Sequence, residues 1–243
     1  MFLNFFTYKI YHGQLKDLNL NLNFKTVINT INPHSYIVSK KDKTFSNALL
    51  SSDYLLPDGI GIVLAIKILF NIKTARLTGA KIHDFLLKKA EIESLSVFYL
   101  GSSNKTLKLI KSKNTFRFAG LKASYFSPPF KPAFSENDNK NILKKINSFK
   151  PDILFVGMTA PKQEKWTFLN KDKIDSNIIV SIGAVFDFYA GTVIRPSPFV
   201  QKIGFEWAVR FAKEPIKLFK RNFVSTPLFL FDLFLEKIKQ LIP

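Results

Sequence analysis

The sequence contains no cysteine, and this absence excludes several kinds of site. Without thiols the chain has no disulfide, no iron–sulfur cluster held by thiolates and no cysteine-based zinc site, and it suits a reducing compartment. Its three histidines, His12, His34 and His83, show neither H-x-x-x-H nor H-E-x-x-H spacing. No Asp-x-Asp pair and no G-x-S-x-G elbow occur. We therefore expect no metal centre, no cofactor and no α/β-hydrolase chemistry.

Long apolar runs are also missing. No stretch reaches the ~18 consecutive apolar residues that a membrane-spanning helix needs. The run over residues 59–72 is interrupted by Lys67, and the run over 223–235 carries Asp232. Residues 1–6 are apolar but lack the charged segment and the small-residue cleavage site of a secretory signal. We expect these first residues to form a strand in a cytoplasmic protein.

Acidic residues are scarce. The chain has 18 of them against 36 basic residues, which gives a net charge of +18 and a pI of about 9.9. A nucleic acid, an anionic membrane or a phosphorylated ligand would each suit this charge. Only five of the basic residues are arginine, however, and many lysines lie in Asn-rich polar stretches such as residues 139–150. A compositional drift towards Lys and Asn explains the charge equally well, so the charge alone does not identify a partner.

The remaining composition predicts a folded α/β protein. With 243 residues, 47% of them hydrophobic, the chain is long enough to bury a core. Short, continuously apolar segments alternate with segments of helical spacing, a pattern typical of a parallel sheet covered on both faces. We expect a Rossmann-like α/β domain over residues 1–192. Its clearest strands are predicted at residues 25–31, 97–100, 153–156 and 178–182, and its clearest helices at 35–50, 60–70 and from 104 onwards.

The pattern changes after Gly191. Four prolines, at positions 196, 198, 215 and 227, separate short helical segments, so we expect a helical C-terminal appendage over residues 193–243. Its aromatic and basic side chains would form either an amphipathic surface that faces a membrane or an aromatic core with a solvated basic face. They are Phe205, Trp207, Phe211, Phe219 and Phe223, beside Arg210, Lys213, Lys217, Lys220 and Arg221.

Candidate site residues follow from the fold, because ligands of open α/β sheets bind where loops leave the carboxyl ends of the strands. Four such turns stand out, at residues 30–33, 57–61, 101–104 and 157–166. Asp58 could act chemically or could cap the next helix. Thr30 and Asn32 could do no more than shape the turn into Pro33. Residues 101–104 could offer backbone N–H groups to a phosphate, or could form an ordinary strand-to-helix turn.

Two further residues each allow two interpretations. Gln163 follows Pro161 in a predicted first helical turn, where it could bind a ligand or simply be exposed. Asp187 lies between Phe186 and Phe188, and a carboxylate in such an apolar stretch needs partners. It is therefore either a site residue or, as we favour, a structural hydrogen-bond anchor.

Seven motifs in this order give the chain a resemblance to the WecG/TagA/CpsF family of bacterial glycosyltransferases, over about residues 25–230. They lie at residues 30–33 (TINP), 57–61 (PDGIG), 76–79 (RLTG), 101–103 (GSS), 157–166 (GMTAPKQEKW), 183–191 (GAVFDFYAG) and 204–210 (GFEWAVR), the last followed by Glu214 and Pro215. Each motif is short, and their common order is what carries the resemblance.

The resemblance implies that the protein transfers a sugar from a UDP-sugar to an undecaprenyl-diphosphate-linked sugar, in the synthesis of a cell-surface polysaccharide. The donor sugar would be N-acetylmannosamine or a related hexose, and the anomeric carbon would be inverted. The resemblance also implies that Asp58 is the catalytic base and that Thr30 is the threonine of the pocket. The substrate-binding positions that it implies are Asn32, Gly59, Arg76, Thr78, Gly79, Gly101, Ser102, Gln163 and Asp187.

The resemblance further assigns the acceptor diphosphate to basic residues of the appendage. These are Arg195, Arg210 and Arg221, with Lys217 at a position where relatives often have arginine. We expect the appendage to close over the site and to face an anionic membrane, with the protein cytoplasmic and peripheral on the inner face of the cell membrane. A homo-oligomer is compatible with this expectation, and nucleic acid is not an expected partner. The alternatives are a basic nucleic-acid-binding protein and a non-catalytic subunit that binds nucleotide sugars.

Overall fold

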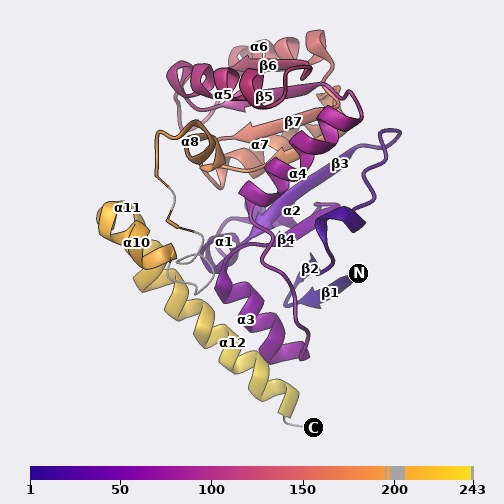
Figure 1. Ribbon diagram of the computed structural model, residues 1–243. Helices are drawn as coiled ribbons and strands as arrows, with labels where there is room; N and C mark the ends of the chain where they lie inside the picture. Colours follow the sequence, from indigo (N-terminus) through magenta and orange to yellow (C-terminus); the bar gives the residue numbers. More distant parts are fainter. Residues whose placement is uncertain (195, 198–205, 242–243) are drawn as a thin grey trace.

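A six-stranded parallel sheet forms the centre of the computed structural model, which describes residues 1–194, 196–197 and 206–241 without the side chains of Arg210, Lys213 and Lys217 (Figure 1). The strands are β3 (Thr26–Ile31), β4 (Tyr54–Pro57), β5 (Val97–Gly101), β6 (Ala123–Phe126), β7 (Ile153–Gly157) and β8 (Ile178–Ser181). They lie side by side in the order β4-β3-β8-β7-β5-β6. This parallel order requires a crossover between consecutive strands, and helices supply these crossovers.

Helices flank both faces of the sheet, so the expected Rossmann-like α/β fold is confirmed. Those that connect the strands are α1 (Pro33–Ser39), α2 (Lys43–Leu50), α3 (Ile60–Phe70), α4 (Gly79–Ile92), α5 (Asn104–Arg117), α6 (Glu136–Phe149) and α7 (Lys162–Asn170), and α8 (Val185–Ala190) follows β8. Two short 3-10 turns, η1 (Leu15–Asp17) and η2 (Lys171–Lys173), complete this part of the chain. The expected helix over residues 60–70 is therefore present as α3.

The sheet is covered on both sides because its strands are apolar on both sides. Side chains alternate along a strand, so Val97 and Tyr99 of β5 join one core cluster whereas Phe98 and Leu100 join another. The helices α4, α5 and α8 pack on the first face. The helices α1, α2, α3, α6 and α7 pack on the opposite face. All residues of β5 and β7 are buried, which explains why their sequences are continuously apolar.

Residues 1–6 contain the expected strand, but it lies outside the main sheet. β1 (Phe2–Phe5) pairs with β2 (Tyr8–Tyr11) in an antiparallel hairpin, and β2 packs beside β4. Phe5 and Ile10 are fully buried in the cluster that includes Ile31 and Leu55. The hairpin thus extends the core on the side of the sheet that α1 and α3 cover.

Two helices replace the single helix expected over residues 35–50. α1 ends at Ser39, and Asp42 caps α2 by accepting a hydrogen bond from the Phe45 amide at 2.9 Å. Helical spacing alone conceals this break, although Asp before an apolar run is a capping signal. Sequence reasoning also misses β4 and β6, because β4 ends in Pro57 and β6 is only partly buried, so neither has the continuously apolar sequence of the other strands.

The C-terminal segment is helical, as expected. It contains α10 (Glu206–Lys213), α11 (Pro215–Phe219), the π-helical turn η3 (Lys220–Ser225) and α12 (Thr226–Leu241). α12 runs beside α3 and packs against both α1 and α3 (Figure 1). Phe229 and Leu233 anchor it, because they are buried in the cluster that also holds Ile62 and Ile66. No helix in the described part of the chain is both long and apolar enough to span a membrane.

The C-terminal helices also expose apolar side chains. Phe231 and Phe234 of α12 are 58% and 60% exposed. Phe219 and Phe223 stack on one another at the surface, with their ring centroids 5.3 Å apart. The other large exposed apolar side chains of these helices are Trp207, Ile216, Val224, Leu228, Leu230, Leu235 and Leu241. These observations favour an apolar surface over an aromatic core for the described part of the segment.

Phe229→Ala should detach α12 from the body of the protein. The Phe229 side chain is fully buried, and a Phe-to-Ala change in a core costs about 3–5 kcal/mol of unfolding free energy. Phe231→Ala, two positions further along the same helix, removes an exposed side chain and should cost less than about 0.5 kcal/mol. Urea denaturation of both variants makes the comparison. Equal losses of stability would mean that α12 is not docked through Phe229.

Candidate active site

The carboxyl ends of the parallel strands bring most of the predicted site residues to one edge of the sheet. Thr30 lies at the end of β3, Asp58 follows β4, Ser102 follows β5, and Gly183 follows β8. From β3 the chain connects to β4, its neighbour on one side. From β4 it crosses over to β5, which lies on the other side of β3, so the direction of the strand connections reverses in this part of the sheet. Open α/β sheets bind their ligands at such a reversal.

Thr30 and Asp58 lie on neighbouring strand ends. Thr30 is paired with Leu56 in the sheet register, and the Asp58 amide donates a hydrogen bond to the Ile31 carbonyl at 2.8 Å. Both side chains are partly exposed. Gly59, with φ of +89°, occupies the N-cap position of α3, so Asp58 precedes the cap instead of forming it. The geometry thus places Asp58 and Thr30 on neighbouring strand ends at an accessible edge, and their roles stay predictions.

Glycines let the start of α3 approach the turn after β3. A Cβ on Gly61 would lie 2.6 Å from Cγ of Pro33, and one on Gly59 would lie 3.8 Å from Cβ of Asn32. Asn32 caps α1, because its Oδ1 accepts a hydrogen bond from the Ser35 amide at 3.0 Å. The turn-shaping role of Asn32 is therefore observed, and its contact with a substrate stays a prediction.

Arg76 lies beside the end of β4 and pairs with the C-terminal segment. The Leu77 amide donates to the Pro57 carbonyl at 2.9 Å, which places residues 76–79 next to β4. Nη2 of Arg76 lies 2.8 Å from Oε2 of Glu206 in α10, and the two side chains are only 17% and 14% exposed. A partly buried ion pair therefore connects α10 to the edge that carries Asp58.

Thr78 and Gly79 have packing roles at the start of α4. The Thr78 hydroxyl caps the helix by accepting a hydrogen bond from the Lys81 amide at 3.3 Å. A Cβ on Gly79 would lie 3.0 Å from Cγ2 of Val185 and 3.3 Å from the carbonyl oxygen of Ile182. Glycine thus lets α4 approach α8 closely. The predicted contacts of both residues with a substrate stay predictions.

Gly101 and Ser102 form a tight turn between β5 and α5. Gly101 has φ of +124°, and a Cβ there would collide with the carbonyl oxygen of Gly157 at the end of β7. The Ser102 amide donates to that same carbonyl at 3.1 Å, and its hydroxyl donates to Oδ1 of Asp187 at 3.5 Å. Asp187 is partly exposed, and its Oδ1 also accepts from the Thr192 hydroxyl at 3.5 Å. These contacts suit a structural anchor, although the acid is not buried.

Gln163 connects two loops at the carboxyl edge. Its side chain is only 3% exposed, so the interpretation of Gln163 as an exposed helix residue is wrong. Its Oε1 accepts hydrogen bonds from the Met158 amide at 3.1 Å and from the Gly183 amide at 3.0 Å. Met158 follows β7 and Gly183 follows β8. Gln163 therefore braces the two loops, and a direct contact with a substrate stays a prediction.

Glu164 is an acid in an apolar environment. It is 3% exposed, and its Oε1 accepts a hydrogen bond from Nε2 of Gln163 at 2.8 Å. Its Oε2 has no hydrogen-bond partner among the described residues. Burial raises the pKa of Glu164 to about 7, and the bond from Gln163 offsets only part of this effect. The protein thus holds a buried carboxyl that changes its charge near neutral pH.

Arg221, one of the predicted acceptor residues, approaches the same edge from η3. Burial, followed by the positive charges of Arg221 and Lys220, lowers the pKa of His34, the second residue of α1. Nδ1 of His34 lies 2.8 Å from the Ser225 hydroxyl, so η3 is bonded to α1 just beyond the turn after β3. The other predicted acceptor residues, or their side chains, lie outside the described residues: Arg195, Arg210 and Lys217.

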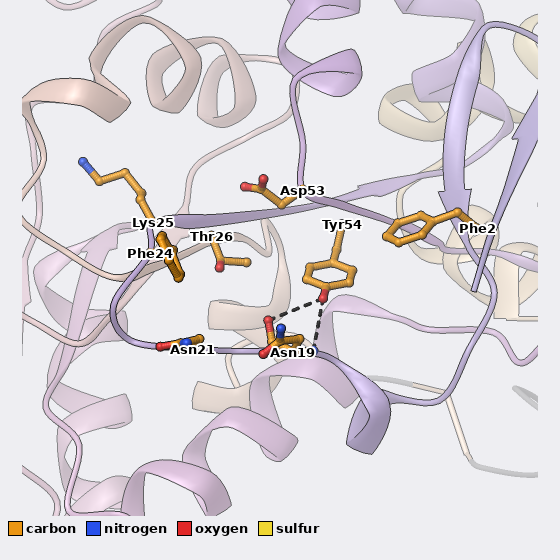
Figure 2. Close-up of a pocket in the computed structure, with 8 residues that line it drawn as sticks. All are labelled: Phe2, Asn19, Asn21, Phe24, Lys25, Thr26, Asp53 and Tyr54. Carbon is orange, nitrogen blue, oxygen red and sulfur yellow. Dashed lines mark hydrogen bonds between the residues drawn. The ribbon is translucent and has the colours of Figure 1, made fainter.

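A pocket of about 290 Å³ opens at the opposite edge of the sheet (Figure 2). Thr26 and Tyr54, which begin β3 and β4, lie in its wall. The Asn19 amide donates to the Tyr54 hydroxyl at 3.0 Å, as Figure 2 shows. Because the predicted site residues follow the other ends of these strands, we do not assign the pocket to the reaction. Within the described residues, no group of three His, Asp or Glu side chains could hold a metal ion.

Comparison with known proteins identifies the family. The sequence pattern of the glycosyl transferase WecG/TagA/CpsF family matches residues 10–242. The chain belongs to this family. It is similar to the N-acetylglucosaminyldiphosphoundecaprenol N-acetyl-beta-D-mannosaminyltransferase of Bacillus subtilis strain 168, with 27% identity over 189 residues that cover 78% of this chain and 72% of the relative. A protein of the same name from Staphylococcus aureus strain NCTC 8325 is 25% identical over 181 residues, which cover 74% of this chain and 69% of the relative.

These matches confirm the resemblance and the enzyme class, so the protein is a glycosyltransferase. Three residues at the candidate site are absent from the predictions made from the sequence, namely His34, Glu164 and Glu206. Glu164 and Glu206 lie inside motifs of the family, so their positions offered a signal. His34 offered none, because its partner Ser225 lies 191 positions further along the chain.

The unfolding free energy of this glycosyltransferase should depend on pH through the ionisation of Glu164. Between pH 4.5 and about 7 the unfolded chain releases the Glu164 proton while the folded chain keeps it, so stability falls as the pH rises. The shift corresponds to about 3 kcal/mol. Glu164→Gln has no carboxyl to ionise and therefore lacks this pH-dependent loss of stability. The unfolding free energy of the variant, relative to that of wild type, should rise by about 3 kcal/mol from pH 4.5 to pH 8. Urea denaturation at both pH values measures it.

The matched control for this experiment is Glu91→Gln, at an exposed position on α4. Its stability relative to wild type should change little over the same pH range. A difference between Glu164→Gln and wild type that stays constant from pH 4.5 to pH 8 would contradict the raised pKa of Glu164.

Proposed function

We propose that this glycosyltransferase moves N-acetylmannosamine or a related hexose from a UDP-sugar to a sugar linked to undecaprenyl diphosphate, in the synthesis of a cell-surface polysaccharide. The relatives from B. subtilis and S. aureus are named for an N-acetylmannosaminyl transfer to N-acetylglucosaminyldiphosphoundecaprenol. The observation that carries the proposal is the position of Asp58 beside Thr30, at the strand ends where α/β enzymes bind their ligands.

In this proposal Asp58 is the catalytic base. A sugar hydroxyl is a weak nucleophile, and a carboxylate that accepts its proton during the attack accelerates the reaction by about 10²–10⁴-fold. The acceptor oxygen forms a bond to the anomeric carbon of the donor while the bond from that carbon to UDP breaks. The proton goes to Asp58, the electron pair of the broken bond goes to UDP, and the anomeric configuration inverts.

The leaving UDP carries negative charge that the carboxyl edge would stabilise. The turn at Gly101 and Ser102 leads directly into the 14-residue helix α5, whose N-terminus favours an anion through its backbone amides and its dipole. Arg76 adds a guanidinium beside β4, at 2.8 Å from Glu206. Charges fixed in advance around a leaving group stabilise the transition state without reorganisation. Thr30, Gln163 and Asp187 would complete the donor site.

We also propose that residues 193–243 act as a unit that holds the acceptor diphosphate. Arg221 and Lys220 approach His34 on α1, and Glu206 pairs with Arg76. Both contacts support a position of this unit at the carboxyl edge. The other basic residues proposed for the diphosphate are Arg195, Arg210 and Lys217. Closure of the unit over the site would exclude water from the reacting sugars.

The proposed location is cytoplasmic, on the inner face of the cell membrane, where a lipid-linked acceptor is within reach. α12 exposes Phe231 and Phe234 in a chain with a net charge of +18. Apolar side chains that enter the lipid interface and basic side chains that attract anionic lipids both favour association, the latter by about 1 kcal/mol per nearby residue. The protein would thus bind the membrane surface peripherally.

Asp58→Asn should abolish most of the transfer. The assay measures UDP release from a panel of UDP-sugars in the presence of a short-chain prenyl-diphosphate-linked N-acetylglucosamine. Loss of the base should lower kcat by about 10²–10⁴-fold and leave donor binding nearly unchanged. Asp172→Asn, at an exposed position of η2, should keep wild-type activity. Full activity of Asp58→Asn would refute its role as the base, and wild-type enzyme without acceptor-dependent UDP release would refute the proposed function.

The double variant Phe231→Ser/Phe234→Ser should weaken binding to vesicles that contain phosphatidylglycerol. Burial of one such side chain contributes about 1.5–3 kcal/mol, so the loss of two should reduce the partition coefficient at least ten-fold. Sedimentation with vesicles measures it, and added salt should weaken the binding of wild type. Phe116→Ser, 89% exposed on α5, is the control and should bind as wild type does. Equal losses in both variants would contradict a membrane surface on α12.

A further inference from the structure

The hydrogen bonds around Gln163 admit one orientation of its side-chain amide. The amides of Met158 and Gly183 both donate to one end, which must therefore be the oxygen. At the other end, Nε2 donates to Oε1 of Glu164 at 2.8 Å. A reversed amide would turn its NH₂ group towards two donors and its oxygen towards a carboxyl oxygen. Glu164 thus favours the orientation in which Gln163 ties the two loops together.

Glu164 itself is fixed by the packing of α7. This helix packs against β8 and α2, and Trp166 lies in the core with Ile179. Glu164 and Thr167, one helical turn apart, are both buried. Oε2 of Glu164, the hydroxyl of Thr167 and the hydroxyl of Ser181 on β8 have no hydrogen-bond partner among the described residues. Buried polar groups of this kind are rare in native proteins, and a buried acid opposes folding when it ionises.

The two loops that Gln163 ties together lead to the predicted donor residues. The loop after β8 continues from Gly183 into α8, which carries Asp187. The loop after β7 follows Gly157, whose carbonyl accepts a hydrogen bond from the Ser102 amide at 3.1 Å. A change in either loop would therefore move Ser102 or Asp187 relative to Asp58.

We propose that Glu164 is a positioning residue of this enzyme: by orienting the side-chain amide of Gln163, it holds the loops after β7 and β8 in the arrangement that binds the donor. The inference rests on the proposed use of a UDP-sugar donor. Glu164 acts through Gln163 alone and does not touch the reacting atoms. A buried acceptor for Nε2 explains why an acid is kept at a position where its charge opposes folding.

The experiment compares donor KM and kcat in five variants of the full-length enzyme, one of them a control. Glu164→Leu removes the acceptor for Nε2 and should raise the donor KM about ten-fold, with a smaller change in kcat. Glu164→Gln keeps an acceptor oxygen and should stay within about three-fold of wild type. Gln163→Leu should match Glu164→Leu, and the double variant should be no worse than either, because the two residues act as one unit. Thr167→Val, the control, loses a buried polar atom of the same helix and should keep wild-type constants.

Three results would overturn the inference. They are a donor KM of Glu164→Leu within two-fold of wild type, losses that multiply in the double variant, and a ten-fold increase of KM in Glu164→Gln. If Glu164→Leu does not fold, Glu164→Gln decides the question, because it keeps the shape of the side chain. Wild-type enzyme is assayed alongside. If wild type releases no UDP in the presence of acceptor, the proposed function is contradicted. The role of Glu164 is contradicted only when wild type is active and the variants give one of the three results above.

Discussion

The candidate active site depends on the alignment of parallel strand ends at one edge of a single sheet. Because these strands point the same way, turns that are far apart in the sequence meet there. The packing is so close that a side chain is excluded at two points, at Gly101 against the backbone of Gly157 and at Gly61 against the ring of Pro33. The edge is therefore formed by backbone groups and a few polar side chains. Asp58 lies at this edge directly after β4, where its carboxylate is in a position that suits a base.

The C-terminal segment reaches this edge through three different kinds of contact. Phe229 and Leu233 anchor α12 by burial, Glu206 reaches Arg76 by an ion pair, and Ser225 is bonded to His34. The apolar contacts set the position of the segment, whereas the polar contacts place its charges close to the strand ends. Burial and, after it, the positive charges of Arg221 and Lys220 lower the pKa of His34, and these two cations beside the edge would attract a diphosphate. One helix thus combines an anchored face with an exposed apolar face, which suits an enzyme whose acceptor is a lipid.

Sequence reasoning succeeds where burial alone decides the structure. The strands β5, β7 and β8 are apolar at every position except their ends because both faces are covered, and α3 is bounded by Gly59 and a left-handed Asn71. It fails for β4, which ends in a proline, for β6, which is only partly buried, and for the break between α1 and α2. The motif order predicted which turns meet, but spacing could not reveal that Gln163 is buried between two loops. The pair of Arg76 and Glu206, 130 positions apart, is equally invisible to local patterns.

The central claim is that the donor binds at the carboxyl edge of the sheet. Backbone amide NMR of the full-length protein, recorded during a titration with UDP, tests it most directly. The account predicts shifts that saturate with UDP at Ser102, Met158 and Gly183, the residues that follow β5, β7 and β8. Shifts confined to Asn19, Thr26 and Tyr54, around the pocket at the opposite edge, would contradict it.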